Sequence, residues 1–93
     1  MIMMQHKHIQ VFGTVQGVGF RHHTELIAKK LDRFGTVQNV EDYVDIYAQG
    51  DEEQIKSFID KVIAGASPAS SVSDYSIEDL DTTNRYSEFK TIY

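Results

Sequence analysis

The sequence contains no cysteine, no tryptophan and only one proline among its 93 residues. Without cysteine, disulfides, a thiol nucleophile and a thiolate metal site are all excluded. No apolar run approaches the roughly 20 residues that a transmembrane helix requires. The first eight residues, MIMMQHKH, are too short to form a signal peptide. We therefore expect a cytoplasmic protein that does not associate with membranes.

The sequence also lacks an excess of basic charge. Its formal net charge is −5 and its isoelectric point is about 5.2, which argues against nucleic acid or an anionic membrane as a general partner. The length suits a single domain covering residues 1–93, with residues 1 to about 6 disordered. We expect this domain to be a monomer.

Hydrophobic periodicity predicts five strands and two helices. Alternating or β-rich segments at 8–13, 36–40, 43–49, 72–80 and 85–93 predict strands. Residues from about 22 to 31 predict a first helix, with Leu26, Ile27 and Leu31 on its apolar stripe and Gly35 at its end. Residues 51–65 predict a second helix, which Asp51 and Gln54 would start as a capping box. Its apolar stripe comprises Ile55, Phe58, Ile59, Val62 and Ile63.

The order of these elements is β-α-β-β-α-β followed by one additional C-terminal strand. Each helix carries a single apolar stripe, so both helices must cover the same face of one sheet. This pattern predicts an α+β protein with the ferredoxin-like arrangement, a sandwich of two helices on one face of an antiparallel sheet. The fold by itself does not indicate a function.

The stretch GTVQGVGFR, residues 13–21, places three glycines between the first strand and the first helix. Glycine permits positive φ angles and a close approach of the backbone to a ligand. Successive N–H groups and a helix N-terminus can then converge on an anion, and Arg21 adds a planar fork that matches phosphate geometry. The stretch therefore predicts a phosphate-sized anion site, although a flexible connection with a surface arginine has to be considered as well.

Several other residues permit different interpretations. His6 and His8 share one strand face and His22 and His23 follow the loop, so a histidine metal site is an alternative. Tyr43, Asp45 and Tyr47 form an exposed stripe that is compatible with RNA stacking or a protein interface. Their acidic surroundings disfavour RNA. Gln16 is interpreted as framework of the anion site, and Thr24 as a hydroxyl that starts the helix or braces the loop.

The stretch GTVQGVGFR resembles the signature of the acylphosphatase family, and GTVQN at 35–39 resembles the second motif of that family. The resemblance extends from His8 to Tyr93. Members of the family hydrolyse the carboxyl–phosphate bond of acyl phosphates to a carboxylate and inorganic phosphate. The resemblance implies that Arg21 binds the phosphate and that Asn39 orients the attacking water, with no metal or other cofactor. The backbone cradle for the phosphate would comprise Val15, Gln16, Gly17, Val18, Gly19 and Phe20.

The sequence departs from the family pattern at two points near the second motif. Thr36 stands where the family usually has an aromatic residue, and the turn after Asn39 is shorter than usual. We expect both departures to affect substrate preference, because neither changes Arg21 or Asn39. The alternative function is a non-catalytic anion-binding or regulatory module, which would not need a water-positioning amide at Asn39.

Overall fold

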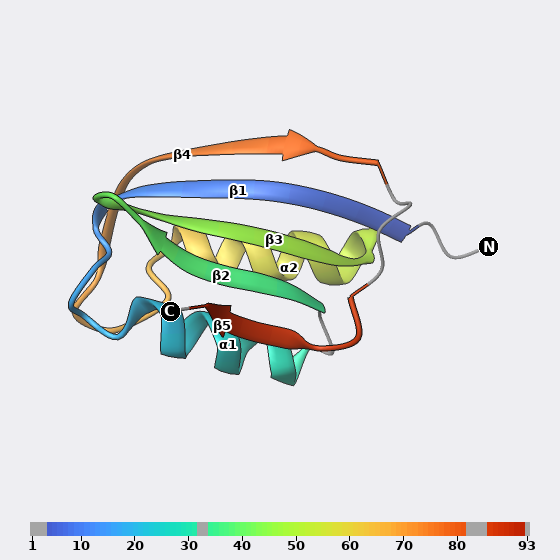
Figure 1. Ribbon diagram of the computed structural model, residues 1–93, viewed down its shortest axis with the longest axis horizontal. Helices are drawn as coiled ribbons and strands as arrows, with labels where there is room; N and C mark the ends of the chain where they lie inside the picture. The colour runs from blue at the N-terminus through green and yellow to red at the C-terminus, as the bar shows by residue number, and fades with distance from the viewer. Residues whose placement is uncertain (1–3, 32–33, 82–85, 93) are drawn as a thin grey trace.

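The computed structural model describes residues 4–31, 34–81 and 86–92, and all structural statements below concern these residues. Five strands and two helices form two layers (Figure 1). In chain order they are β1 (Met4–Thr14), α1 (Phe20–Lys30), β2 (Phe34–Val40), β3 (Tyr43–Asp51), α2 (Glu52–Ile63), β4 (Ser71–Asp79) and β5 (Phe89–Ile92).

The strands form one sheet in the order β4-β1-β3-β2-β5. Neighbouring strands are antiparallel except for β5, which pairs in parallel with β2. The predicted ferredoxin-like arrangement and the additional C-terminal strand are confirmed, but the sheet is mixed rather than wholly antiparallel. The reason is topological: β4 and β5 occupy opposite edges of the sheet, and β5 runs in the direction of β2 (Figure 1).

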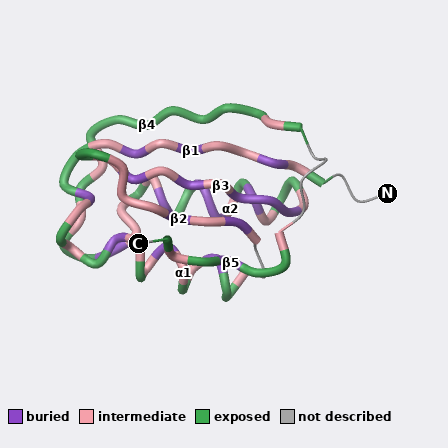
Figure 2. The backbone as a smooth tube through the Cα atoms, in the orientation of Figure 1, coloured by how far each residue is buried: buried purple, intermediate pink, exposed green. Residues whose placement is uncertain are grey.

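Both helices pack on one face of this sheet, and the core lies between the two layers (Figure 2). The predicted inward residues of β1 and β3 are fully buried, and so is most of the α2 stripe. The buried apolar residues of the core are Ile9, Val11, Val15, Phe20, Ala28, Val37, Val44, Ile46, Ala48, Ile55, Phe58, Ile59, Val62 and Phe89. Packing of these two layers therefore fixes where α1 and the loop before it lie relative to the ends of the strands.

Four local predictions are wrong. Residues 4–6, expected to be disordered, belong to β1, because Met4 and the residues after it pair with the end of β3 at Asp51; residues 1–3 lie outside the described residues. Leu26 is 46% exposed because α1 turns Phe20, Thr24 and Ala28 toward the sheet.

Gly35 does not end the first helix but lies in β2, and this is the third error. Its φ is +144°, and a Cβ atom there would lie 1.7 Å from the carbonyl oxygen of Tyr47. The glycine is therefore required by the close approach of β3. The final strand also begins later than predicted: residues 86–88 are not strand and β5 covers Phe89–Ile92, while residues 85 and 93 of the predicted strand lie outside the described residues. In the part of the chain that the structure describes, no helix has the length and apolar character needed to cross a membrane.

Candidate active site

The chain leaves β1 at Thr14 and makes a short loop before α1 begins at Phe20. Gly17 and Gly19 both adopt left-handed backbone angles, with φ of +74° and +76°. Other residues adopt these angles only with strain. A Cβ atom added at Gly17 would meet no atom within 4 Å. The loop is therefore open on that side, and its backbone is accessible to a ligand.

Only the backbone of this loop is available for binding over most of its length. Val15 and Phe20 are 1% exposed and belong to the core, while Val18 packs against it. The apolar side chains therefore anchor the loop to the core, and the exposed Gly17 and Gly19 form its solvent-facing surface. This distribution suits recognition by N–H groups rather than by side chains.

The N-terminus of α1 is not closed by the protein itself. Its N-cap residue is Gly19, no side chain caps the helix, and its first turn contains no acidic residue. The first N–H groups of a helix have no partner within the helix, and they carry partial positive charge. The carbonyl of Gly19, in contrast, is well engaged: it accepts from the backbone N–H of His23 at 3.1 Å and lies 2.9 Å from His23 Nδ1.

Gln16 connects the loop to the turn between β2 and β3. Its Nε2 donates to the carbonyl oxygens of Glu41 and Tyr43, at 2.9 Å in each case. Glu41 has a left-handed φ of 53°, which makes the turn tight. Because Asn39 lies two residues before Glu41, these two hydrogen bonds hold the loop and the end of β2 together.

Arg21 lies in the first turn of α1 and is half-buried. Its Nη1 donates to the carbonyl oxygen of Ile92 at 3.3 Å. This contact draws the guanidinium toward the end of β5, next to the start of α1 in Figure 1. One side of the guanidinium is thus held by the protein at the edge of the sheet where the glycine loop lies.

Asn39 lies near the end of β2, on the same face of the strand as the buried Val37. Its Oδ1 is buried and has no hydrogen-bond partner among the described residues. Its Nδ2 is not among the buried unpaired side-chain atoms of the described residues. Thr36, the residue that departs from the family pattern, alternates to the opposite face of β2.

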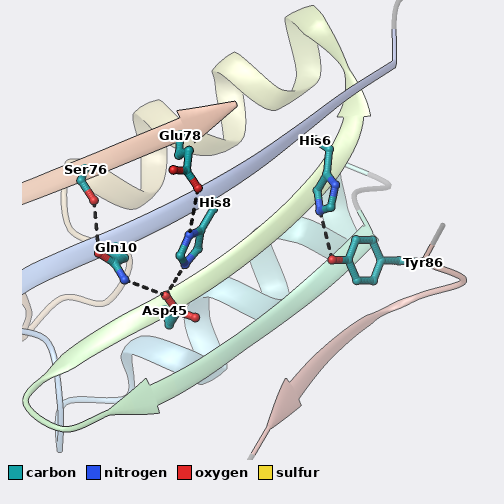
Figure 3. A network of polar contacts seen from close by, with 7 residues as sticks. All are labelled: His6, His8, Gln10, Asp45, Ser76, Glu78 and Tyr86. Atoms are coloured by element: carbon teal, nitrogen blue, oxygen red, sulfur yellow. Dashed lines mark hydrogen bonds and ion pairs between the residues drawn. The ribbon is translucent and has the colours of Figure 1, made fainter. Parts of the chain in front are cut away.

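Two of the four histidines considered as metal ligands, His6 and His8, contact other side chains on the open face of the sheet (Figure 3), whereas His22 and His23 lie on α1. His8 Nε2 lies 2.5 Å from Asp45 Oδ1, and its ring stacks on Tyr47 with centroids 4.4 Å apart. His6 Nε2 lies 3.0 Å from the Tyr86 hydroxyl. No three side chains of ligand type converge anywhere in residues 4–31, 34–81 and 86–92. His22 and His23, which follow Arg21, have ring centroids 5.7 Å apart, but among the described residues no third ligand-type side chain joins them.

The tyrosines of the open face are not candidate bases. Burial raises the pKa of Tyr47, and the nearby carboxylates of Asp45 and Glu78 raise it further. Burial also raises the pKa of Tyr86, with a smaller contribution from Tyr47. Both phenols therefore stay protonated at neutral pH. They lie on the face opposite to the helices, away from the N-terminus of α1.

A family model described as Acylphosphatase matches residues 7–91. The chain belongs to the acylphosphatase family. Acylphosphatases from Staphylococcus haemolyticus (strain JCSC1435) and Staphylococcus aureus (strain Newman) are 54% and 55% identical to it over 89 residues, which is 96% of this chain and 100% of each relative. The crystal structure of acylphosphatase from Bacillus subtilis matches with a TM-score of 0.89 and 38% identity, covering 98% of this chain and 100% of that chain. The predicted activity, hydrolysis of acyl phosphates, is thereby confirmed.

Three features of the candidate site could not be predicted from the sequence of this acylphosphatase. The motif identified Gln16 as framework, but no local signal indicated that its partners are two carbonyls in the turn after β2. Thr24 is fully buried and has no partner among the described residues, so it neither caps the helix nor braces the loop. The contact from Arg21 to Ile92 spans 71 positions and could not be read from either segment alone.

Proposed function

We propose that the backbone from Val15 to Phe20 and the guanidinium of Arg21 bind the phosphoryl group of an acyl phosphate, and that Asn39 orients the attacking water. The observation that carries this proposal is the N-terminus of α1, which has neither a side-chain cap nor an acidic residue in its first turn. A helix N-terminus of this kind favours an anion. Asn39 lies at the strand end that Gln16 links to the same loop.

The proposed reaction is a direct transfer of the phosphoryl group to water. A bond forms between the water oxygen and phosphorus while the bond between phosphorus and the carboxyl oxygen breaks. The carboxylate leaves as an anion without a general acid, because the pKa of its conjugate acid is about 4. The water proton passes to a phosphoryl oxygen, which yields a carboxylate and inorganic phosphate.

The protein's part in this reaction is positioning and charge stabilisation, which are the main requirements of phosphoryl transfer. Arg21 supplies a fixed cation with a forked set of donors, and the loop N–H groups supply partial positive charge without rearrangement. Asn39 donates a hydrogen bond to the water but does not accept its proton. We propose that this set of groups acts without a metal ion.

The test is release of inorganic phosphate from acetyl phosphate before and after exhaustive treatment with EDTA. We expect the same rate in both samples. We also expect little release from glycerol phosphate, whose alkoxide leaving group is far more basic than a carboxylate. A rate that falls with EDTA and returns when a divalent cation is added would contradict the metal-free mechanism.

We further propose that the protein acts as a cytoplasmic monomer that does not bind nucleic acid. The exposed edge strand β4 carries three carboxylates, Asp74, Glu78 and Asp79. Like charges on an edge strand oppose pairing of the strand with a second copy, and the net charge of −5 opposes phosphate backbones. Size-exclusion chromatography with light scattering checks this proposal, and a mass of twice 10.6 kDa would contradict it.

A further inference from the structure

Three buried side-chain oxygens without a hydrogen-bond partner among the described residues belong to α1 and to the two strands that it covers. They are Oγ1 of Thr24, Oδ1 of Asn39 and Oγ1 of Thr91. A buried polar atom without a hydrogen bond costs free energy. Three such atoms in one part of the structure, one of them on a proposed functional side chain, require an explanation.

Asn39 and Thr91 lie on adjacent strands and on the same face of the sheet. Thr91 is in register with Val37 in the parallel pairing of β5 and β2. Val37 is fully buried in the core, so this is the face that the helices cover. Asn39 follows Val37 by two residues and therefore shares its face. The two side chains are diagonal neighbours beneath α1.

Thr24 belongs to the helix layer that covers these two strands. It is fully buried on the inward face of α1, which packs on both β2 and β5 (Figure 1). Arg21, three residues earlier on that helix, reaches the carbonyl oxygen of Ile92. Because Thr91 directly precedes Ile92, the next inward residue of α1 lies over the stretch of β5 that contains Thr91.

The hydrogen-bonding capacities of the three oxygens are complementary. The Asn39 Oδ1 only accepts, whereas each threonine hydroxyl both donates and accepts. No two of them are hydrogen-bonded to each other. A buried water typically makes two to four hydrogen bonds of this kind. One enclosed water would therefore satisfy all three oxygens at once.

We propose that one enclosed water joins Thr24, Thr91 and Oδ1 of Asn39, and that the two threonines are positioning residues for the Asn39 amide. With Oδ1 held in this contact, the side chain cannot rotate, and Nδ2 keeps pointing toward the water that attacks phosphorus. Neither threonine touches the substrate. This inference rests on the proposed function of Asn39 and extends it to the residues that fix its orientation.

The test compares Thr24→Val with Thr24→Ser, and Thr91→Val with Thr91→Ser, in the full-length protein with acetyl phosphate as substrate. Valine keeps the shape of threonine and removes the hydroxyl, whereas serine keeps the hydroxyl. We expect each valine variant to lose on the order of 10- to 100-fold in kcat, the scale of a small misplacement of a reacting group. We expect KM and competitive inhibition by inorganic phosphate to stay unchanged, and serine to restore kcat.

A purely structural role would give a different pattern, in which thermal stability falls and kcat of the folded variant is normal. A normal kcat in a folded valine variant overturns the assignment of that residue. If Thr24→Val does not fold, Thr24→Ala removes the same hydroxyl with a smaller side chain and is judged by the same criterion, with Thr24→Ser as its control.

A double-mutant cycle with Asn39→Ala separates this inference from the proposed function. If Thr24 acts through Asn39, adding Thr24→Val to Asn39→Ala changes kcat by less than about twofold, because coupled residues are not additive. A full additional loss in that background overturns the inference. A normal kcat in Asn39→Ala itself overturns the proposed function, and this inference with it. A normal kcat in Thr24→Val beside an impaired Asn39→Ala overturns the inference alone.

Discussion

The two helices of this domain pack on the same sheet face, yet their N-termini are built in opposite ways. Helix α2 is capped by Asp51, whose Oδ1 accepts from the backbone N–H of Gln54 at 3.0 Å, and Glu52 and Glu53 occupy its first turn. Helix α1 has the left-handed Gly19 as its N-cap residue, without a side-chain cap or an acidic residue in its first turn, and carries Arg21 in that turn instead.

Both helices face the same physical problem, namely unpaired N–H groups and partial positive charge at the first turn. In α2 the protein satisfies these groups with its own carboxylates, which stabilises the fold. In α1 it leaves them open and adds a cation, which makes the same end suitable for an anion. A local departure from the rules of helix stability therefore marks the candidate site.

The largest effect is expected from Asn39→Ala. If Asn39 contributes mainly in the transition state, kcat falls about 10²–10³-fold, by analogy with the loss of an oxyanion-hole donor. Binding of inorganic phosphate should persist, because the cradle is intact. Asn39→Asp should not rescue turnover, since it places a negative charge beside an anionic substrate. Steady-state hydrolysis and phosphate calorimetry on the same samples measure the two quantities.

The matched control is Gln38→Ala, which removes an amide from the adjacent position on the opposite face of β2. We expect this variant to retain normal turnover. Near-normal turnover in folded Asn39→Ala would mean that Asn39 is an ordinary strand residue.

The next largest effect is expected from Arg21→Ala. Loss of a charge-assisted hydrogen bond to phosphate, worth about 1.5–3 kcal/mol, should weaken competitive inhibition by phosphate by about 10- to 100-fold. Arg21→Lys should rescue poorly, because a point charge cannot replace the fork. Lys56→Ala, on the capped helix α2, also removes one positive charge and should leave competitive inhibition by phosphate unchanged. Unchanged phosphate affinity in Arg21→Ala would remove Arg21 from the site.

The smallest effect, and the one that sharpens the contrast between the helices, is expected from Asp51→Ala. The loss of this cap should reduce the free energy of unfolding by about 1 kcal/mol and leave kcat and KM unaltered. Chemical denaturation and steady-state kinetics provide the two readouts. A loss of activity in the folded variant would show that the N-terminus of α2 is not purely structural.

Much of the fold could be predicted because several segments carry a clear period. The alternation in β1 and β3 and the Asp51 cap of α2 are local signals, and they agree with the structure. The errors arose where tertiary contacts decide. Leu26 fits a core position by its spacing, but the sheet determines which side of α1 is inward, and Leu26 lies outside that side. Gly35 fits a helix end by its residue type, but it lies in β2, where β3 approaches closely.

The candidate site shows the same division. Arg21 and Asn39 are predicted as site residues from contiguous motifs. The contacts of Gln16 with the β2–β3 turn join segments that are far apart in the chain, and so does the packing of α1, which buries Thr24, on β2 and β5. Neither residue type nor local spacing carries that information, and only the packing of α1 on β2 and β5 reveals it.

The central claim is that the open N-terminus of α1, and not the capped N-terminus of α2, binds the phosphoryl group. Titration of inorganic phosphate into ¹⁵N-labelled protein, followed by backbone amide chemical shifts, tests this claim directly. The account predicts saturable shifts in the amides of residues 15–21 and none beyond the background in those of residues 52–54. Shifts centred on another surface, or saturable binding that leaves residues 15–21 unperturbed, would contradict it.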